Sequence, residues 1–444
     1  MSMIKRIRIT VHIVWTLALT SFVSSLAAQE AVIPDPGLNA AISEELNIII
    51  GPISEQDLLS LTSLFAGDRN IRQTDGLEGA VNLTFLDLDS NLLTNFALPS
   101  GFTSLTTLDV SFNALTQCTI PEGQTNLESL VLEGNALANF TAPGGLTGLA
   151  LLDLGINRLS DFTVPADMTN LIRLSLDFNQ LTNLTLPANL NGFGGLDLED
   201  NRLSRLEFPA GLSSLSSLTL RGNQLIALSF PADMTNLTFV DIGENQLSDL
   251  TMPVPLPHLS FLRLSTNNLT RLVLPSGMTN LEAIFLAGNQ LTNLTLSSGL
   301  TNLVQIDLRG NQLTTLTLPP DFTRLSTLVL DGNPLATLVL SESIAAGRLA
   351  GLVASLSAQG VSVITYPEAI RLIAPHLRED HNFDFEVTGP PGVYTILQSA
   401  DLASWSTLGL ATNTLGSINF TDVTANLSSQ KFYRAMPQDP SQFR

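Results

Sequence analysis

The chain has 444 residues, a net charge of −20 and an apolar content of 44%. That length is enough for two or three domains, and the apolar content is enough for a large core. The strong negative charge argues against a nucleic-acid partner, because phosphate binding needs a basic surface. Because Cys118 is the only cysteine, no intrachain disulfide can form.

The first 28 residues have the pattern of a secretory signal. Three basic residues lie between positions 5 and 8, residues 9–23 are mainly apolar, and Ser25-Leu26-Ala27 fits a small-x-small cleavage site. We therefore expect residues 1–28 to be removed on export, which changes the net charge from −20 to −23. A membrane anchor is the alternative, but the apolar run is shorter than the ~20 residues that span a bilayer. No later segment is long and apolar enough to do so.

Residues 29–60 predict a helical N-terminal cap. Pro34-Asp35-Pro36 opens a helix with one apolar face. Ser54-x-x-Asp57 has the spacing of a capping box and predicts the start of a second, short helix.

A 22-residue phrase fills residues 61–341. After one degenerate copy, in which Arg69 replaces the asparagine, the phrase Leu-x-x-Leu-x-Leu-x-x-Asn, with Val, Ile or Phe at some of the leucine positions, occurs twelve times without a gained or lost residue. Its asparagines are Asn91, Asn113, Asn135, Asn157, Asn179, Asn201, Asn223, Asn245, Asn267, Asn289, Asn311 and Asn333. A strict period of this length indicates a solenoid, in which each coil buries its apolar residues against the next coil.

Each phrase contains a short alternation, such as Leu86-x-Leu88, which predicts a strand. Copies of this strand must stack in parallel, about 4.8 Å apart, into one sheet. The asparagine follows the strand, where its amide can bond backbone groups that the turn leaves unpaired. On the back of the coil, a proline follows phrases such as Leu184-Thr185-Leu186. Proline disfavours helix, so we expect extended segments and turns there.

The register ends after Leu340. Residues 342–358 predict one helix and residues 361–364 a last strand, which together make residues 342–367 a C-terminal cap of the solenoid. Residues 368–444 predict a small β-sandwich, because short alternating segments are separated by glycine and proline turns. Its expected strands are Phe383–Val387, Val393–Gln398, Trp405–Leu410, Ser417–Phe420 and Lys431–Ala435. Trp405 and Tyr433 are either ligand platforms or, as we favour, core residues.

The repeated phrase resembles the leucine-rich repeat family over about residues 61–340. The front segment, with Ile33-Pro34-Asp35-Pro36-x-Leu38 and Ser54-Glu55-Gln56-Asp57-Leu58, is similar to the helical cap of internalin-like bacterial proteins. Asp401-Leu402-x-x-Trp405 and Phe432-Tyr433-Arg434-Ala435 resemble a C-terminal module of secreted proteins of verrucomicrobial and planctomycete-type bacteria. The resemblance to leucine-rich repeats implies a curved solenoid with its parallel sheet on the concave face. Family members mostly bind proteins or glycans there and are rarely enzymes.

The resemblance places the residues that flank the strand leucines on the concave face. Candidate binding residues are Asp87, Asp89, Asp109, Glu133, Asp153, Asp177, Asp197, Glu199, Arg221, Asp241, Arg263, Phe285 and Arg309. Up to Glu199 the two rows carry eight acids and no base, and after it arginines and acids are mixed. One interpretation is an acidic ribbon that attracts a basic protein. The other is that aspartate is a default of this position and keeps the sheet soluble.

No pattern in the sequence indicates catalysis. The histidines beyond the signal segment, His258, His376 and His381, have no cysteine partner, and no metalloprotease, nucleophile-elbow or phosphate-loop phrase occurs. No loop has the ligand pattern of a Ca²⁺ site, so we expect no metal and no cofactor. Cys118 falls in an interior apolar row, which predicts an inert thiol.

The sequence therefore predicts a secreted or surface-associated binding or adhesion protein that recognises a protein, or a glycan, through the concave face. The protein partner is expected to be basic if the acidic ribbon is the site. Two alternatives remain open: a structural component of the cell envelope without a defined ligand, and a polysaccharide-binding accessory protein.

Overall fold

The computed structural model describes residues 29–250, 252, 256–425 and 430–438. The expected secretory signal, residues 1–28, lies outside this described part. The chain divides into two compact units, Met1–Arg158 and Leu159–Arg444. Among the described residues, no helix has the length and apolar character needed to cross a membrane.

The described part of the first unit begins with two short helices. α2 (Pro36–Glu45) is capped by Asp35, whose side chain accepts hydrogen bonds from the backbone N–H groups of Gly37 and Leu38. The predicted capping box is confirmed, because Ser54 and Asp57 exchange hydrogen bonds at the start of α3 (Glu55–Leu58). A single 3₁₀ turn, η1 (Leu77–Gly79), follows the degenerate repeat.

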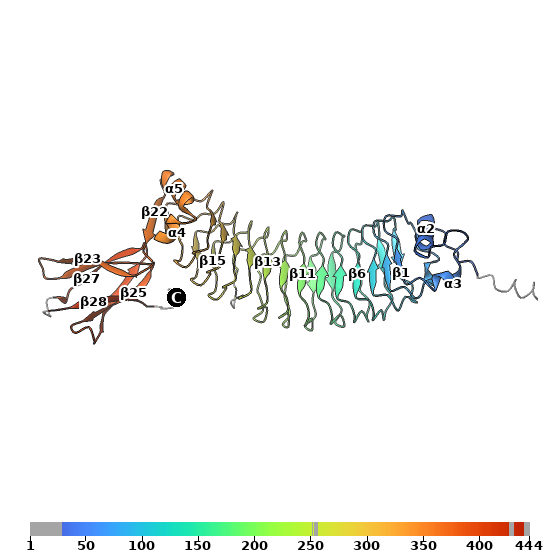
Figure 1. The fold of residues 1–444 in the computed structure, drawn as a ribbon, viewed down its shortest axis with the longest axis horizontal. Coiled ribbons are helices and arrows are strands. Elements are labelled where there is room, and N and C mark those ends of the chain that lie inside the picture. The colour runs from blue at the N-terminus through green and yellow to red at the C-terminus, as the bar shows by residue number, and fades with distance from the viewer. Residues whose placement is uncertain (1–28, 251, 253–255, 426–429, 439–444) are drawn as a thin grey trace, which may run out of the picture. The chain divides into compact units, whose positions relative to one another are not determined.

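Each coil of the first unit contributes one short strand to a parallel sheet (Figure 1). These strands are β1 (Ser63–Phe65), β2 (Phe85–Asp87), β4 (Thr107–Asp109), β6 (Ser129–Val131) and β7 (Leu151–Asp153). Paired residues are one repeat apart, as with Leu86 and Leu108. The strand is centred on the first leucine of the alternation, and the second leucine lies at the start of the exit turn. There Leu88 N–H still donates to the Asp109 carbonyl at 2.8 Å.

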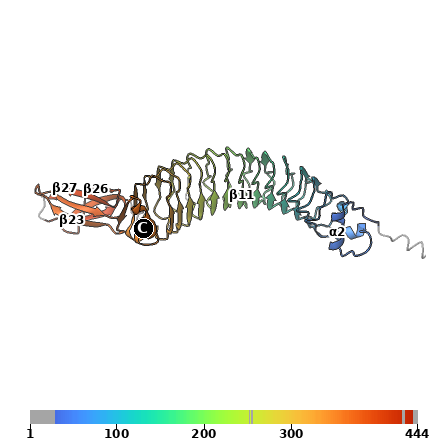
Figure 2. The ribbon, with the colours of Figure 1, turned by 90° about the horizontal axis from the view of Figure 1, so that it is seen from above.

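The second unit continues the same pattern of parallel strands (Figure 2). They are β9 (Arg173–Ser175), β11 (Gly195–Asp197), β12 (Ser217–Thr219), β13 (Phe239–Asp241), β14 (Phe261–Arg263), β16 (Ala283–Phe285), β18 (Gln305–Asp307) and β20 (Thr327–Val329). The central residue of every one of these strands is buried. The predicted fold class, a leucine-rich-repeat solenoid with a parallel sheet, is thus confirmed.

The back of the coils is extended, as the prolines predicted. Short parallel pairs form between β3 (Asn95–Ala97) and β5 (Gln117–Thr119), between β8 (Asp161–Thr163) and β10 (Asn183–Thr185), and between β15 (Arg271–Val273) and β17 (Asn293–Thr295). A three-stranded group joins β19 (Thr315–Thr317), β21 (Thr337–Ser341) and β22 (Ser362–Tyr366). The middle residues of these pairs are buried, as with Phe162 beside Leu184, except that Cys118 in β5 is half-buried.

The repeated asparagines connect successive coils. Asn201 is buried, and its Oδ1 accepts a hydrogen bond from Leu181 N–H at 2.9 Å in the preceding coil. Its Nδ2 donates to the carbonyl of Leu176 at 2.8 Å and to that of Leu198 at 3.2 Å. The same set recurs at Asn223 and Asn245. Both ends of the amide are therefore satisfied by backbone groups that the turn would otherwise leave unpaired.

The C-terminal end of the repeats differs from the prediction of one helix over residues 342–358. Two helices form instead, α4 (Glu342–Ala346) and α5 (Ala350–Ala358), with Gly347 between them in a non-helical conformation. A Cβ at Gly347 would lie 2.8 Å from the Ser343 carbonyl oxygen, and glycine is a poor helix former. The break turns Leu349 into the core. The predicted last strand is β22, which pairs with β21 on the back of the coil.

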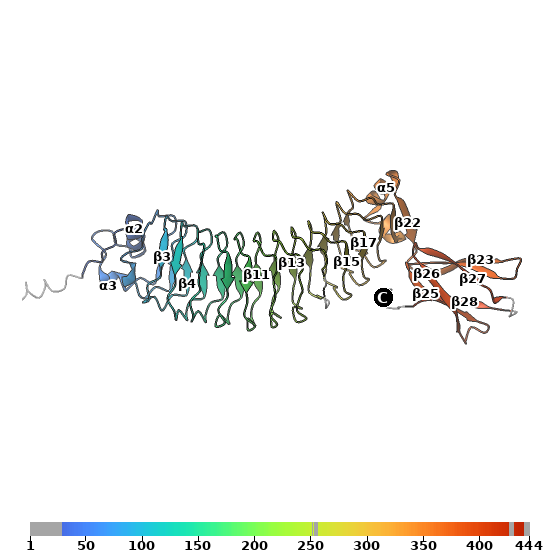
Figure 3. The same cartoon turned by 180° about the vertical axis from the view of Figure 1, so that it is seen from behind.

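The C-terminal residues form two three-stranded antiparallel sheets (Figure 3). One contains β23 (Arg371–Leu377), β24 (Phe383–Thr388) and β27 (Ser417–Asp422), and the other β25 (Gly392–Ser399), β26 (Ser406–Asn413) and β28 (Phe432–Pro437). Buried residues of both sheets, namely Phe385, Val387, Tyr394, Ile396 and Ala411, make one hydrophobic core. The expectation of a small all-β region after the repeats is met.

Sequence reasoning missed β23, which contains Pro375. Its register shifts between Ile373 and His376, and Ala374 has a left-handed φ of 49°. A bulge and a proline together break the alternation that identifies a strand.

The two aromatic residues weighed as core or ligand platforms differ from each other. Tyr433 packs on the core, stacks on Phe383 with 5.2 Å between ring centroids, and donates to the buried Asp422. Trp405 is only half-buried and donates its indole N–H to the Leu402 carbonyl at 3.2 Å. Both side chains are half-buried, but only Tyr433 is among the residues that pack on the described core, so the core expectation describes Tyr433 and not Trp405.

Candidate protein-binding face

The surface of the long parallel sheet is built from side chains on either side of each buried leucine. We call the residue that ends each strand the first flanking row, from Asp87 to Val329, and the residue two positions later the second flanking row, from Asp89 to Asp331. Side chains alternate across a strand, so both rows face away from the core. All thirteen candidate residues belong to these rows.

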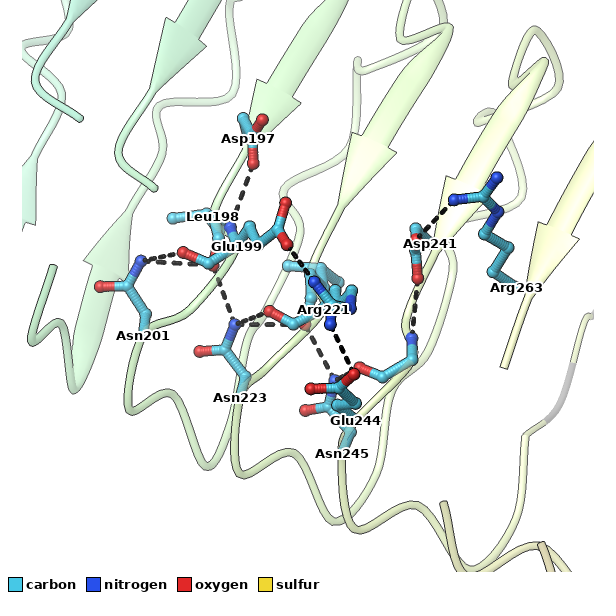
Figure 4. Close-up of polar contacts among 12 residues, drawn as sticks. Asp197, Leu198, Glu199, Asn201, Arg221, Asn223, Asp241, Glu244, Asn245 and Arg263 are labelled. Atoms are coloured by element: carbon cyan, nitrogen blue, oxygen red, sulfur yellow. Dashed lines mark hydrogen bonds and ion pairs between the residues drawn. The ribbon is translucent and has the colours of Figure 1, made fainter. Parts of the chain in front are cut away.

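Aspartates of the first flanking row hold the turn by which the chain leaves the strand. Asp109 Oδ1 accepts hydrogen bonds from the N–H and the hydroxyl of Ser111, at 2.9 and 2.6 Å. Asp197 accepts from Glu199 N–H at 3.0 Å (Figure 4), and Asp241 accepts from Gly243 N–H at 3.0 Å. The same bond forms at Asp87, Asp153 and Asp307. These carboxylates therefore have a structural role in addition to their charge.

Burial, and after it the neighbouring acids, raises the pKa of two of these carboxylates. Burial raises the pKa of Asp197 to about 6, and the charges of Asp177 and Glu199 act in the same direction. Burial also raises the pKa of Asp87, with further contributions from Asp89 and Asp109. Within the first unit, Asp87, Asp89, Asp109, Glu133 and Asp153 are half-buried, and neither flanking row carries a lysine or arginine.

In the second unit, two of the three predicted arginines are neutralised by acids. Arg221 bridges two carboxylates, with one guanidinium nitrogen 2.5 Å from Glu199 and another 2.5 Å from Glu244 (Figure 4). Both hydrogen bonds raise the pKa of Arg221. Arg309 binds Asp307 with its Nε and a terminal nitrogen, the shorter contact being 2.6 Å. Burial opposes ionisation of Asp307, but the hydrogen bonds from Arg309 hold its pKa below the ordinary value.

Arg263 is arranged differently. Its guanidinium lies over the rings of Phe239 and Phe285, at 5.6 and 5.2 Å from their centroids. Its nearest carboxylate is Asp241 at 3.7 Å, beyond hydrogen-bond distance. The sheet register produces this cluster, because Arg263 pairs with Asp241 on one side and with Phe285 on the other. The two rings thus fix the guanidinium while its N–H groups keep access to solvent.

An open groove of about 590 Å³ surrounds Arg263. Its lining comes from both flanking rows over strands β11 to β18, with Phe239, Glu244 and Gln305 from neighbouring positions. Glu244 was not predicted as a site residue, because it lies immediately before the repeated Asn245 and does not flank a strand leucine. Its left-handed φ of 53° turns the side chain toward Arg221.

The titratable side chains of the described residues bear on metal binding and on thiol chemistry. Among them, no group of three or more His, Cys, Asp or Glu side chains is arranged to hold a metal ion. Burial raises the pKa of the Cys118 thiol to about 12, so the thiolate needed for nucleophilic chemistry is not formed near neutral pH.

Comparisons with known proteins agree with this geometry. Residues 154–261 match the family model of the BspA type leucine rich repeat region, and residues 279–322 match a leucine rich repeat model. A search of curated protein sequences finds no match. Among solved structures, an internalin (inlF) from Listeria monocytogenes is 25% identical with a TM-score of 0.51, over 69% of this chain and 98% of that one.

The functional domain of InlJ from Listeria monocytogenes is also similar, with 19% identity and a TM-score of 0.58 over 80% of this chain and 94% of that one. That domain includes a cysteine ladder, whereas this chain has a single cysteine and an asparagine in every regular coil. The chain therefore has the leucine-rich-repeat fold, with residues 154–261 similar to the BspA type of repeat and a solenoid similar to that of the internalins.

Proposed function

We propose that this chain is a recognition or adhesion protein that binds a protein partner through the surface of the long sheet that the two flanking rows form. The groove around Arg263 is the observation that carries this proposal. Arginine and aromatic residues supply most of the binding energy in protein interfaces. Here one arginine is already ordered between two rings, so little side-chain entropy is lost when a partner binds.

A glycan is the alternative ligand for this groove. Sugars are commonly held by stacking on an aromatic ring face. In the groove, the guanidinium of Arg263 already lies over the rings of both Phe239 and Phe285. This arrangement favours a partner that hydrogen-bonds to the guanidinium, such as a protein carboxylate or backbone carbonyl.

The charge of the sheet surface supports a basic contact elsewhere on the partner. In the first unit, both flanking rows are acidic without a compensating base. Complementary charge speeds association and selects against acidic competitors.

We also propose that the protein is exported with residues 1–28 removed, to act at the cell surface or in the medium. BspA-type and internalin-like repeats are typical of such proteins, and the order of charged, apolar and small residues at the start of the chain supports it. N-terminal sequencing of the exported protein is expected to begin near Gln29. An exported form that retains Met1 would contradict cleavage.

The binding proposal is tested with immobilised protein of residues 29–444 and proteins extracted from cell surfaces. We expect Arg263→Ala and Phe285→Ala to weaken retention of a captured partner by about tenfold or more each, since interface hot spots cost at least ~2 kcal/mol. The matched control is Arg205→Ala, which removes an exposed arginine on the back of a coil. If the groove variants and the control retain the partner equally, the groove is not the site.

A further inference from the structure

The residue before each repeated asparagine has a left-handed backbone. Five of these positions are glycine: Gly134, Gly222, Gly288, Gly310 and Gly332. Others carry small or polar residues, such as Ser90 and Thr266. Phe112, Ile156 and Phe178 are the large apolar residues in this set, with φ values of 49°, 51° and 49°.

These apolar residues are unfavourable in two ways. A bulky or β-branched side chain rarely adopts a positive φ, because its Cβ approaches the following carbonyl oxygen. In addition, Phe112 is 50% exposed and Ile156 43% exposed, so neither is compensated by burial in the core. The glycines at equivalent positions show that the fold needs no side chain there. Strained and exposed apolar groups of this kind point to a contact with something outside the chain.

In the first unit, Phe112 and Ile156 make one apolar ridge. The position between them is Gly134, where an added Cβ would lie 2.5 Å from the Phe112 ring. The ring therefore covers the Gly134 coil, and the ridge extends over three successive coils. Gly134 N–H donates to the carbonyl of Gly155, which belongs to the second flanking row of the next coil. The ridge therefore runs alongside the second flanking row.

The ridge lies next to acidic side chains of the same coils. Phe112 N–H donates to the Glu133 carbonyl at 2.8 Å, which places the ridge directly after the second flanking row. Asp109, Glu133 and Asp153 belong to these coils, and no basic residue occurs in their flanking rows. An apolar ridge beside acidic rows that contain no basic residue fits a segment with apolar side chains on one edge and cationic side chains on the other.

We propose that the ridge of Phe112 and Ile156, with the acids beside it, docks a cationic amphipathic segment of a partner protein. This inference rests on the proposal that the sheet face of the first unit binds a protein. To the charged contact of the acids it adds an apolar contact, which is made by residues outside both flanking rows.

The probe is a synthetic peptide that alternates lysine and leucine, compared with one that alternates lysine and serine. We expect residues 29–444 to bind the lysine–leucine peptide at least tenfold more tightly. The double variant Phe112→Gly/Ile156→Gly should abolish that preference. It should also keep or raise the denaturation midpoint, because glycine adopts the left-handed backbone without strain.

Two control variants separate the effect of the apolar side chains from the effects of the backbone change and of the acidic charges. Thr266→Gly makes the same backbone change at an exposed position of the second unit, and it should leave peptide binding unchanged. Asp109→Asn/Asp153→Asn removes two charges but keeps an oxygen that accepts the strand-exit hydrogen bond. This variant should weaken both peptides, and salt should reduce the difference between variant and wild type.

The outcomes distinguish the inference from the proposed function. If the glycine double variant still prefers the lysine–leucine peptide, the ridge is not a docking surface. In that case, weaker peptide binding by the Asp109→Asn/Asp153→Asn variant would still support the acidic face as a site. If the ridge and acid variants both bind like the wild type, the acidic face of the first unit is rejected as well. Loss of both peptides in the glycine variant together with a lowered midpoint would show that the two residues serve the fold.

Discussion

At the scale of the residue, the fold depends on a side chain that is donor and acceptor at once. In Asn223, Oδ1 accepts from Leu203 N–H at 3.0 Å, and Nδ2 donates to the Leu198 and Leu220 carbonyls at 2.9 and 3.1 Å. Aspartate has no donor when ionised, and serine is shorter by one heavy atom. The physical demand at this buried turn therefore explains why asparagine recurs without exception in the twelve regular coils.

Replacing one of the repeated asparagines should lower the stability of the repeats measurably. We expect Asn223→Ala to lower the free energy of unfolding by roughly 1–3 kcal/mol, because buried backbone groups lose their partners. The control is Asn189→Ala, which removes an exposed asparagine side chain that donates to the Ala166 carbonyl. Urea titrations of both variants check this, and equal midpoints would show that the ladder adds nothing to stability.

Asp197 links the stability of the second unit to pH. Its pKa of about 6 in the folded chain lies above the ordinary aspartate value of about 3.9. The folded state therefore binds the proton more tightly than the unfolded state. Its stabilising contribution is complete below pH ~4 and is lost as pH rises through 6. We expect Asp197→Asn to flatten the change in unfolding midpoint between pH 5 and pH 7.5, and an unchanged pH profile would contradict this.

At the scale of the element, the carboxylate of Asp35 joins the N-terminal helix α2 to the first coil of the solenoid. Asp35 Oδ1 caps α2 at Gly37 and Leu38, and Oδ2 accepts from Arg72 N–H at 2.8 Å in the degenerate repeat. This repeat has Arg69 in place of the ladder asparagine, and the side chain of Arg69 pairs instead with Glu44 of α2 at 2.5 Å. The helix is thus joined to the first coil by hydrogen bonds at both positions.

Asp35 variants should separate the two roles of this carboxylate. Asp35→Ala removes the helix cap and the link to Arg72, and we expect it to cost about 1–3 kcal/mol of stability. Asp35→Ser keeps an acceptor for the helix cap and should cost less. Hydrogen exchange of the α2 and Arg72 amides reports each role. Equal protection at Arg72 in the wild type and the serine variant would mean that the second oxygen is not needed.

Sequence periodicity predicts elements that repeat and misses elements that occur once. The 22-residue spacing located the strands, the buried leucines and the two flanking rows because every coil obeys the same packing. The break at Gly347 and the bulged strand β23 depend on single residues in irregular segments, where no period helps.

The candidate site was predictable in part for the same reason. Its rows follow from the repeat, but the contacts within it depend on which side chains stand in adjacent coils. Arg263 lies between Phe239 and Phe285 only because residues of neighbouring coils are in register, and no single row contains both the arginine and its two rings. The role of Asp109 and Asp197 in the strand-exit turn also needed coordinates, since charge alone gave no reason to prefer structure over binding.

At the scale of the whole molecule, two kinds of core coexist in one chain. Each repeat coil packs only against its neighbours, so the stability of the solenoid is approximately a sum over adjacent coils. The C-terminal sheets instead enclose a core of their own, formed by Phe385, Val387, Tyr394, Ile396 and Ala411. Residues that pack around this core, such as Ile370, Phe420 and Tyr433, come from the same C-terminal part of the chain.

We therefore expect two unfolding transitions in calorimetry of residues 29–444, one for the repeats and one for the C-terminal sheets. Ile396 is fully buried in β25, so Ile396→Ala should cost about 2–5 kcal/mol and lower only the C-terminal transition, by roughly 10 °C or more. Asn223→Ala should move only the repeat transition. A single transition that both variants shift equally would show instead that the C-terminal sheets and the solenoid unfold as one cooperative structure.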